Sequence, residues 1–175
     1  MSQTLTPEEW RTLRRSRGDL LIAGKAMLAF GIWSSIKAYI GMFFNEDVLS
    51  GFFNEVGETT LSNAELLAVL FVITTILLLF IFAFHLAIYS GAKKESKGRK
   101  VSVFYLLITG LFFFLNVLSV AYSVISIYRD PSNFLFTYIT SILFDLAIVG
   151  NCVDILINGT RCRRLMRRLK EGGAA

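Results

Sequence analysis

Four long apolar stretches, separated by short charged segments, constrain this chain more than any other feature of its sequence. They cover residues 20–44, 66–91, 101–128 and 134–159. A helix needs roughly 20 apolar residues to cross the hydrocarbon core of a bilayer, so each stretch can span it with some tilt. The alternative is a soluble protein with four buried helices, but 175 residues are too few to cover them.

The positions of the basic residues predict the topology. Fifteen of the 18 Lys and Arg lie in three blocks, at residues 11–17, 93–100 and 161–170, whereas the other two connections carry only Arg129. Loops on the cytoplasmic side of a membrane concentrate Lys and Arg near helix ends. We therefore expect an all-α integral membrane bundle of four transmembrane helices with both termini in the cytoplasm.

The amino-acid composition is typical of a membrane protein and indicates which partners it binds. Hydrophobic residues make up 54% of the chain and charged residues 18%, against about 45–50% and 25% in soluble domains. The pI near 9.4 reflects basic segments beside spans, which attract anionic lipid. We expect such lipids as partners, together with self-association or another membrane protein, and no nucleic acid.

Residues 1–19 are predicted to form a cytoplasmic interfacial helix from Pro7 to about Arg17. Thr6 stands at the N-cap and Glu9 at the position that completes a capping box. Trp10 among several arginines suits the membrane interface, although a solvated polar helix is an alternative.

Residues 160–175 are predicted to form a basic amphipathic tail after a membrane domain at 20–159. Cys162, Leu165, Met166 and Leu169 recur at the spacing of one helix face. This helix could lie on anionic lipid or dock on an acidic partner. The candidate docking residues of the two termini are Trp10, Arg14, Arg15, Arg163, Arg164, Arg167 and Arg168.

Ionisable residues inside spans are costly and usually face a cavity or a partner. Lys25, His85 and Asp154 lie at similar depths near the cytoplasmic ends of three spans, and Asn151 shares a helix face with Asp154. One interpretation is a polar site open to the cytoplasm. The alternative is a structural Lys25–Asp154 ion pair with His85 hydrogen-bonded nearby, or a Lys25 side chain that reaches the headgroups.

A second polar group is predicted nearer the middle of the bilayer. Asp145 lies deep in the fourth span, Lys37 could reach it from the first, and Asn116 of the third span has a comparable depth. These residues could hold helices together. They could also line an aqueous path, within one bundle or at a subunit contact.

The sequence offers few groups for catalysis. It has one His and two Cys, no phosphate-binding Gly loop and no nucleophile with a candidate base. We therefore expect no catalytic residues, no metal site and no cofactor. We also expect no disulfide, since Cys152 and Cys162 both fall at a cytoplasmic helix end. A lipid-modifying enzyme that uses Asp145 or Asp154 with His85 is the weakest alternative.

The leading hypothesis is a small non-enzymatic membrane protein that acts through assembly. It would be a homo-oligomer or an accessory subunit of a membrane complex. The alternative is a small ion channel or transporter that uses the polar residues of spans one, two and four. We expect a multi-pass protein of a bacterial cytoplasmic membrane. We expect no signal peptide, because the first apolar stretch is too long for one.

Overall fold

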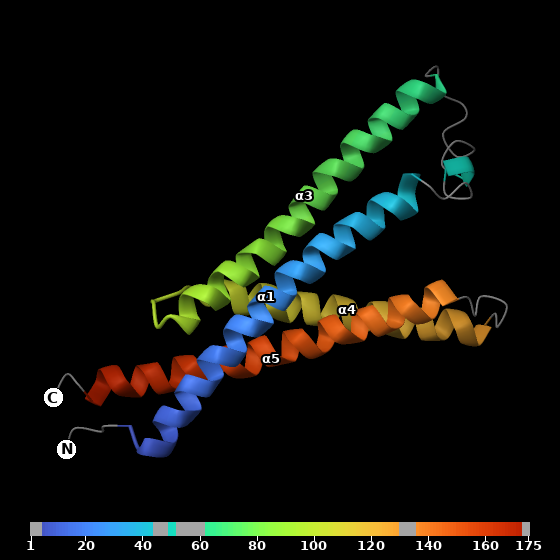
Figure 1. Cartoon of the computed structure of the whole chain (residues 1–175). Coiled ribbons are helices and arrows are strands. Elements are labelled where there is room, and N and C mark those ends of the chain that lie inside the picture. The colour runs from blue at the N-terminus through green and yellow to red at the C-terminus, as the bar shows by residue number, and fades with distance from the viewer. Residues whose placement is uncertain (1–4, 44–48, 52–61, 130–135, 173–175) are drawn as a thin grey trace. The chain divides into compact units, whose positions relative to one another are not determined.

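The computed structural model describes residues 5–43, 49–51, 62–129 and 136–172, and four long helices dominate it (Figure 1). They are α1 (Pro7–Phe43), α3 (Asn63–Ser96), α4 (Phe104–Arg129) and α5 (Phe136–Gly172). Each is long and apolar enough to cross a membrane, and the described ranges contain no strand. The four apolar helices are therefore confirmed. The two connections that carry only Arg129 fall largely outside the described residues.

Helices α1 and α3 both begin with a capping box, and the predicted Thr6–Glu9 box is confirmed. The backbone N–H of Thr6 donates to Glu9 Oε2 at 2.9 Å, and the N–H of Glu9 donates back to Thr6 Oγ1 at 3.2 Å. At the start of α3, Ser62 and Glu65 exchange the same pair of bonds at 2.8 and 3.4 Å. Both boxes satisfy N–H groups that a helix start leaves without partners.

Helices α1 and α5 continue without a break through the predicted junctions between terminal segment and span. In α1 the buried residues Leu13, Leu20 and Met27 repeat every seven positions. In α5 Cys152 and Cys162 are equally buried across the junction. A buried stripe that continues across each junction keeps one face of the helix against its neighbours in unit 1. The terminal segments are thus extensions of the spans rather than separate helices.

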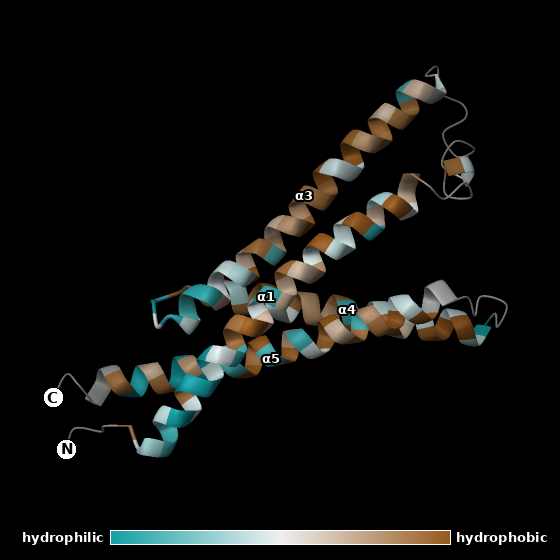
Figure 2. Ribbon diagram, in the orientation of Figure 1, coloured by the Kyte–Doolittle hydropathy of each residue, from teal (hydrophilic) through white to brown (hydrophobic). Residues whose placement is uncertain are grey.

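The described chain divides into two compact units. Unit 1 comprises Met1–Met27 and Ala87–Ala175, and unit 2 comprises Leu28–Leu86. Figure 2 shows that the polar residues of α1, α3 and α5 gather at the ends that belong to unit 1, whereas α4 is apolar along most of its length. The polar ends and the apolar spans are therefore distinct surfaces.

Close helix contacts through small residues hold unit 1 together. A Cβ added to Gly24 of α1 would lie 2.9 Å from Cβ of Ala92 in α3. A Cβ on Gly159 of α5 would lie 2.8 Å from the hydroxyl of Tyr105 in α4. Small residues let helix backbones approach closely, which is how helices associate in lipid. The four helix segments of unit 1 therefore form one packed core.

Unit 2 is a pair of helix segments, 28–43 of α1 and 63–86 of α3. The hydroxyls of Tyr39 and Thr75 share a hydrogen bond between the two segments. The ring of Phe71 packs against Tyr39 and Phe43, with centroids 6.0 and 5.7 Å apart. Gly31 faces His85, so close that a Cβ on the glycine would overlap the imidazole. The hydrogen bond between the two hydroxyls and the ring contacts thus help to join this pair.

Candidate functional site

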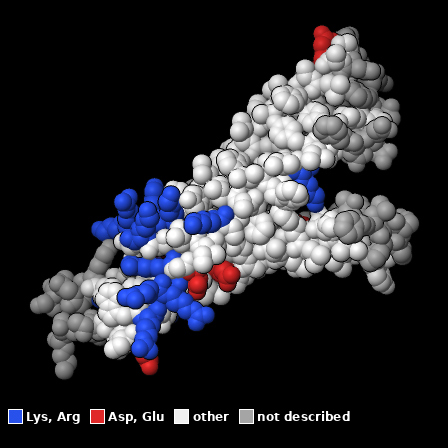
Figure 3. All heavy atoms as spheres, viewed as in Figure 1, with Lys and Arg blue, Asp and Glu red and all other residues white. Residues whose placement is uncertain are grey.

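The strongest concentration of charge lies at one end of unit 1, formed by residues 7–19, 92–103 and 160–169, which we name the basic end. Figure 3 shows Lys and Arg gathered on the visible face of this end, with few acidic side chains among them. The three basic blocks of the sequence therefore come together in space. This arrangement agrees with the predicted topology, although the orientation in a membrane stays a prediction.

A buried carboxylate lies at the centre of the basic end. The side chain of Glu95 is 2% exposed, and its Oε2 accepts hydrogen bonds from Tyr105 Oη at 2.6 Å and Arg163 Nε at 3.0 Å. The guanidinium of Arg163 also lies over the Tyr105 ring, 5.4 Å from its centroid. Three helices, α3, α4 and α5, therefore meet at one charge-assisted cluster.

Arg163 also fixes the α3–α4 connection. Its Nη2 donates to the carbonyl oxygens of Val101 and Ser102 at 3.1 and 2.7 Å. We predicted Arg163 as a docking residue, but three-quarters of its side chain is covered and engaged within the chain. Glu95 and Tyr105 were not among the candidate residues. A sequence feature could have identified Glu95, because it is the only acidic residue among the five basic residues at 93–100.

The α3–α4 connection begins with a tight helix end. Gly98 has a φ of 73°, its N–H donates to the carbonyl of Glu95 at 2.8 Å, and the N–H of Arg99 donates to that of Lys94 at 3.1 Å. This is the Schellman arrangement, which favours glycine at the left-handed position. A Cβ on Gly98 would also lie 2.8 Å from Arg17 Nη2. The turn therefore directs Arg99 and Lys100 back across the end of α3.

An ion pair joins the two chain termini at the basic end. Arg168 Nη1 of α5 lies 2.8 Å from Glu9 Oε1 of α1. The hydrogen bond from the backbone N–H of Thr6, with a contribution from Arg168, holds the pKa of Glu9 below its ordinary value. Arg168 is thus engaged by the chain, whereas Arg164 is exposed. The docking role of either arginine stays a prediction.

The tail predicted as a surface helix buries part of its apolar face. Cys162 is fully covered and Leu165 nearly so. These side chains pack within unit 1, since the stripe of buried residues in α5 continues into the tail. The outward face of residues 160–169 is the basic one, so any partner of the tail would meet arginines rather than an apolar stripe.

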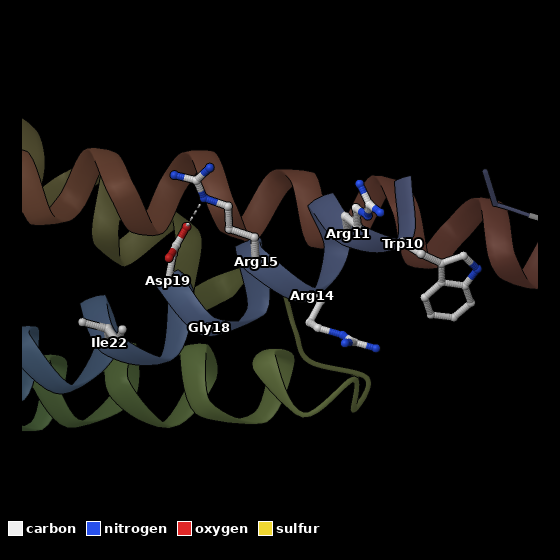
Figure 4. Close-up of a pocket in the computed structure, with 7 residues that line it drawn as sticks. All are labelled: Trp10, Arg11, Arg14, Arg15, Gly18, Asp19 and Ile22. Atoms are coloured by element: carbon white, nitrogen blue, oxygen red, sulfur yellow. Dashed lines mark ion pairs between the residues drawn. The ribbon is translucent and has the colours of Figure 1, made fainter. Parts of the chain in front are cut away.

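A groove runs along the outer side of α1, and we name it the Trp10 groove (Figure 4). Trp10, Arg14 and Ile22 lie along one side of the helix, with Gly18 leaving an open notch between the last two. Arg15 pairs loosely with Asp19 at 3.8 Å. The predicted docking residues Trp10, Arg14 and Arg15 are therefore accessible together. An indole beside arginines suits a membrane surface.

A polar cleft of about 470 Å³ lies between α1 and α5, and we name it the Asp154 cleft. Asp154 is exposed in it, next to Asn158 of the same helix. The lining residues are Thr12, Arg15, Ser16, Asp19, Asp154, Ile157, Asn158 and Arg161. Two arginines and two aspartates line it, so the cleft is polar but has no net formal charge.

The structure does not join Lys25 with Asp154. Both side chains are exposed, and no ion pair connects them in the described part of the chain. His85 is buried in unit 2, where its Nδ1 lies 3.0 Å from the carbonyl oxygen of Ile81. Lys37 also belongs to unit 2 and Asp145 to unit 1. The shared layer with His85 and the Lys37–Asp145 pair therefore stay predictions.

Two polar residues of α5, Asp145 and Asn151, bond to other helices, whereas Asn116 bonds within its own helix. Asp145 Oδ2 accepts a hydrogen bond from Ser119 Oγ of α4 at 2.8 Å. Asn151 Nδ2 donates to the carbonyl oxygen of Ala23 in α1 at 3.0 Å. Asn116 Nδ2 donates to the carbonyl oxygen of Phe112 in its own helix at 2.8 Å. These hydrogen bonds give the two amides and the carboxylate partners that hydrocarbon could not provide.

No three His, Cys, Asp or Glu side chains come close enough to hold a metal ion within the described ranges. The free cysteines Cys152 and Cys162 are both buried. Comparison with known proteins finds no matching family model, no matching curated protein and no matching solved structure.

Proposed function

We propose that this chain is a small non-enzymatic integral membrane protein that acts through assembly, as a homo-oligomer or as an accessory subunit of a membrane complex. The observation that supports this is the low burial of all four helices within the chain. Only 17% of the most apolar window of α3 is buried within the chain. The rest of that surface is available to lipid and to other helices.

Unit 2 supplies a surface suited to another helix. A groove of about 300 Å³ runs along its two segments, lined mainly by apolar side chains such as Ile36, Leu78 and Phe82. The hydroxyls beside it are already used, since Ser35 and Thr75 donate to carbonyls of their own helices. A helix that enters this groove would bind by shape and dispersion, which drive association in lipid.

The charge of the basic end supports a proposal for the orientation of the chain in the membrane. We propose that it faces the cytoplasm of a bacterial cell, where anionic lipid would attract its Lys and Arg. In that orientation the packed core of unit 1 lies near the cytoplasmic surface.

Light scattering of the protein extracted in several detergents tests the assembly proposal. We expect a defined oligomer, or a partner that copurifies after crosslinking in native membranes. Leu79→Trp fills the unit 2 groove and is expected to weaken the association. Leu143→Trp, at an exposed position of α5, is the matched control. A persistent monomer without any crosslinked partner contradicts the proposal.

The Asp154 cleft favours a second candidate function, a small channel or transporter. Its carboxylates and amide could contact an ion or polar solute at one end of a path. Asp154→Asn is expected to reduce ion flux in liposomes if the cleft forms part of that path. Asp19→Asn tests the facing helix. Unchanged flux in both variants removes the support for this candidate.

A further inference from the structure

A second cavity at the basic end combines cationic side chains with a buried carboxylate, and we name it the Glu95 pocket. It encloses about 340 Å³ between the end of α3, the α3–α4 connection and α5. Arg99, Lys100 and Arg167 line it together with Arg163 and Glu95. Its formal charge is positive, so it attracts an anion rather than an ammonium group.

Besides the negative charge that the basic side chains favour, Glu95 favours a ligand that carries a hydrogen-bond donor. Its Oε2 is used by Tyr105 and Arg163. Its Oε1 is buried and receives no hydrogen bond from the described residues, although Arg163 Nε lies 3.0 Å away. An ionised carboxylate oxygen can accept more than one contact, so Oε1 keeps a lone pair for a further donor beside its ion pair with Arg163. A ligand that carries a hydroxyl group could donate to this oxygen.

The position of the pocket favours a lipid as the ligand. Exposed apolar residues, Val103 and Phe104, follow Lys100 by only three and four positions. They begin the apolar surface of α4, so the pocket lies where a spanning helix leaves the hydrocarbon. Phosphate groups of lipids occupy this level of a bilayer. A soluble phosphate would gain nothing from the adjoining apolar surface.

We propose that the Glu95 pocket binds the headgroup of an anionic phospholipid whose phosphate is esterified to a polyol, such as glycerol. Arg99 and Lys100 bind the phosphate, with Arg167 at the same rim, and Glu95 Oε1 accepts a hydroxyl of the polyol. The proposal rests on membrane insertion, but not on the oligomeric state. A monomer would bind the lipid equally well.

Native mass spectrometry of the full chain, titrated with single lipids in detergent, tests the hydroxyl contact. The probes are phosphatidylglycerol and phosphatidylmethanol, which carry the same charge but differ in hydroxyl groups. We expect phosphatidylglycerol to bind about tenfold more tightly, the effect of one hydrogen bond to a charged acceptor. Equal affinities overturn the proposal. Changing the lipid leaves the Glu95–Arg163 contact intact.

Two double variants that remove the same charge test the location. Arg99→Gln with Lys100→Gln alters the pocket, and Arg11→Gln with Arg14→Gln alters the Trp10 groove. Only the first is expected to abolish the preference for phosphatidylglycerol. Loss in both, or in neither, overturns the location. All four positions are largely exposed, so folding is expected to survive.

Soluble glycerol phosphate is the competitor that separates a lipid site from a site for free ligand. At millimolar concentration it is expected to leave lipid binding unchanged, and effective competition overturns the lipid assignment. Light scattering of the same samples reports the oligomeric state independently. Failure of assembly and failure of lipid selectivity are therefore distinguishable.

Discussion

At the residue scale, Glu95 is the side chain on which the basic end depends. It is surrounded by Lys and Arg in the sequence but is buried against Tyr105 and Arg163 in the structure. A buried ion pair gains little over an apolar replacement, yet removal of one partner is costly because the other charge stays behind. Glu95 is therefore expected to be intolerant of single substitution.

Glu95→Ala is expected to destabilise the protein by about 3 kcal/mol, because it leaves Arg163 without its carboxylate. The measurement is the midpoint of unfolding in mild detergent. Asp19→Ala is the matched control, since its ion pair with Arg15 is exposed at 3.8 Å and such pairs contribute roughly 0–1 kcal/mol. Equal losses in both variants contradict the structural role of Glu95.

The lowered pKa of Glu9 predicts how the stability contributed by its contacts with Thr6 and Arg168 changes at low pH. Its pKa in the folded chain is lowered from 4.5, first by the N–H of Thr6 and then by Arg168. A lowered carboxyl pKa contributes stability that is present above the unfolded value and is lost as pH falls through the folded value. Below about pH 4.5, the wild type is therefore expected to lose a stabilisation that Glu9→Gln lacks.

Thermal unfolding between pH 7 and pH 3 measures this contribution. The difference between wild type and Glu9→Gln is expected to shrink as the pH falls. Glu8→Gln is the control on the neighbouring position, which makes no capping-box bond. A pH-independent difference for Glu9→Gln argues against the ionised carboxylate as the cause.

At the element scale, the backbone path of the α3–α4 connection depends on one glycine. Gly98 has a positive φ, and its N–H and that of Arg99 close the end of α3. The connection then presents two carbonyl oxygens to Arg163. Backbone geometry, rather than the side chains of the loop, therefore places Arg99 and Lys100 in the Glu95 pocket.

Gly98→Ala is expected to cost about 1–2 kcal/mol, because an L-residue is strained in the left-handed region, with a further cost if Arg17 must move. The unfolding midpoint in detergent is the measurement. Gly110→Ala in α4 is the control, since a Cβ there meets open space, and it is expected to be neutral or slightly stabilising. An unchanged midpoint for Gly98→Ala contradicts the turn geometry.

At the scale of the whole molecule, the four spans predict one orientation. Both native cysteines are buried, so a membrane-impermeant thiol reagent is expected to label the wild type weakly. This background makes single introduced cysteines informative. Lys97→Cys lies in the basic α3–α4 connection, and Glu58→Cys lies between the first and second apolar stretches.

In intact cells, Glu58→Cys is expected to react with the impermeant reagent, and Lys97→Cys only after the membrane is opened. The reason is the concentration of Lys and Arg on the cytoplasmic side. Mass spectrometry of the labelled protein gives the measurement. Labelling of Lys97→Cys in intact cells would reverse the predicted topology.

The sequence by itself determined the helices and their caps. Apolar length predicts spans directly, because unpaired backbone groups are excluded from lipid, and the Thr6–Glu9 and Ser62–Glu65 boxes depend only on local spacing. The division of the chain near residues 19 and 160 stays a prediction, and α1 and α5 run through both positions without a break. Their continuity depends on buried stripes that face other helices, which the charge pattern concealed.

Only the tertiary structure decided the partners of the charged residues. Helix depth singled out Asp145, and a shared helix face singled out Asn151, but neither predicted Ser119 or the Ala23 carbonyl as their partners. Equal depth also suggested a Lys25–Asp154 pair that the described structure lacks. Depth follows from the rise along one helix, whereas pairing depends on the rotation of each helix about its axis. Packing of small residues such as Gly24 and Gly159 sets that rotation.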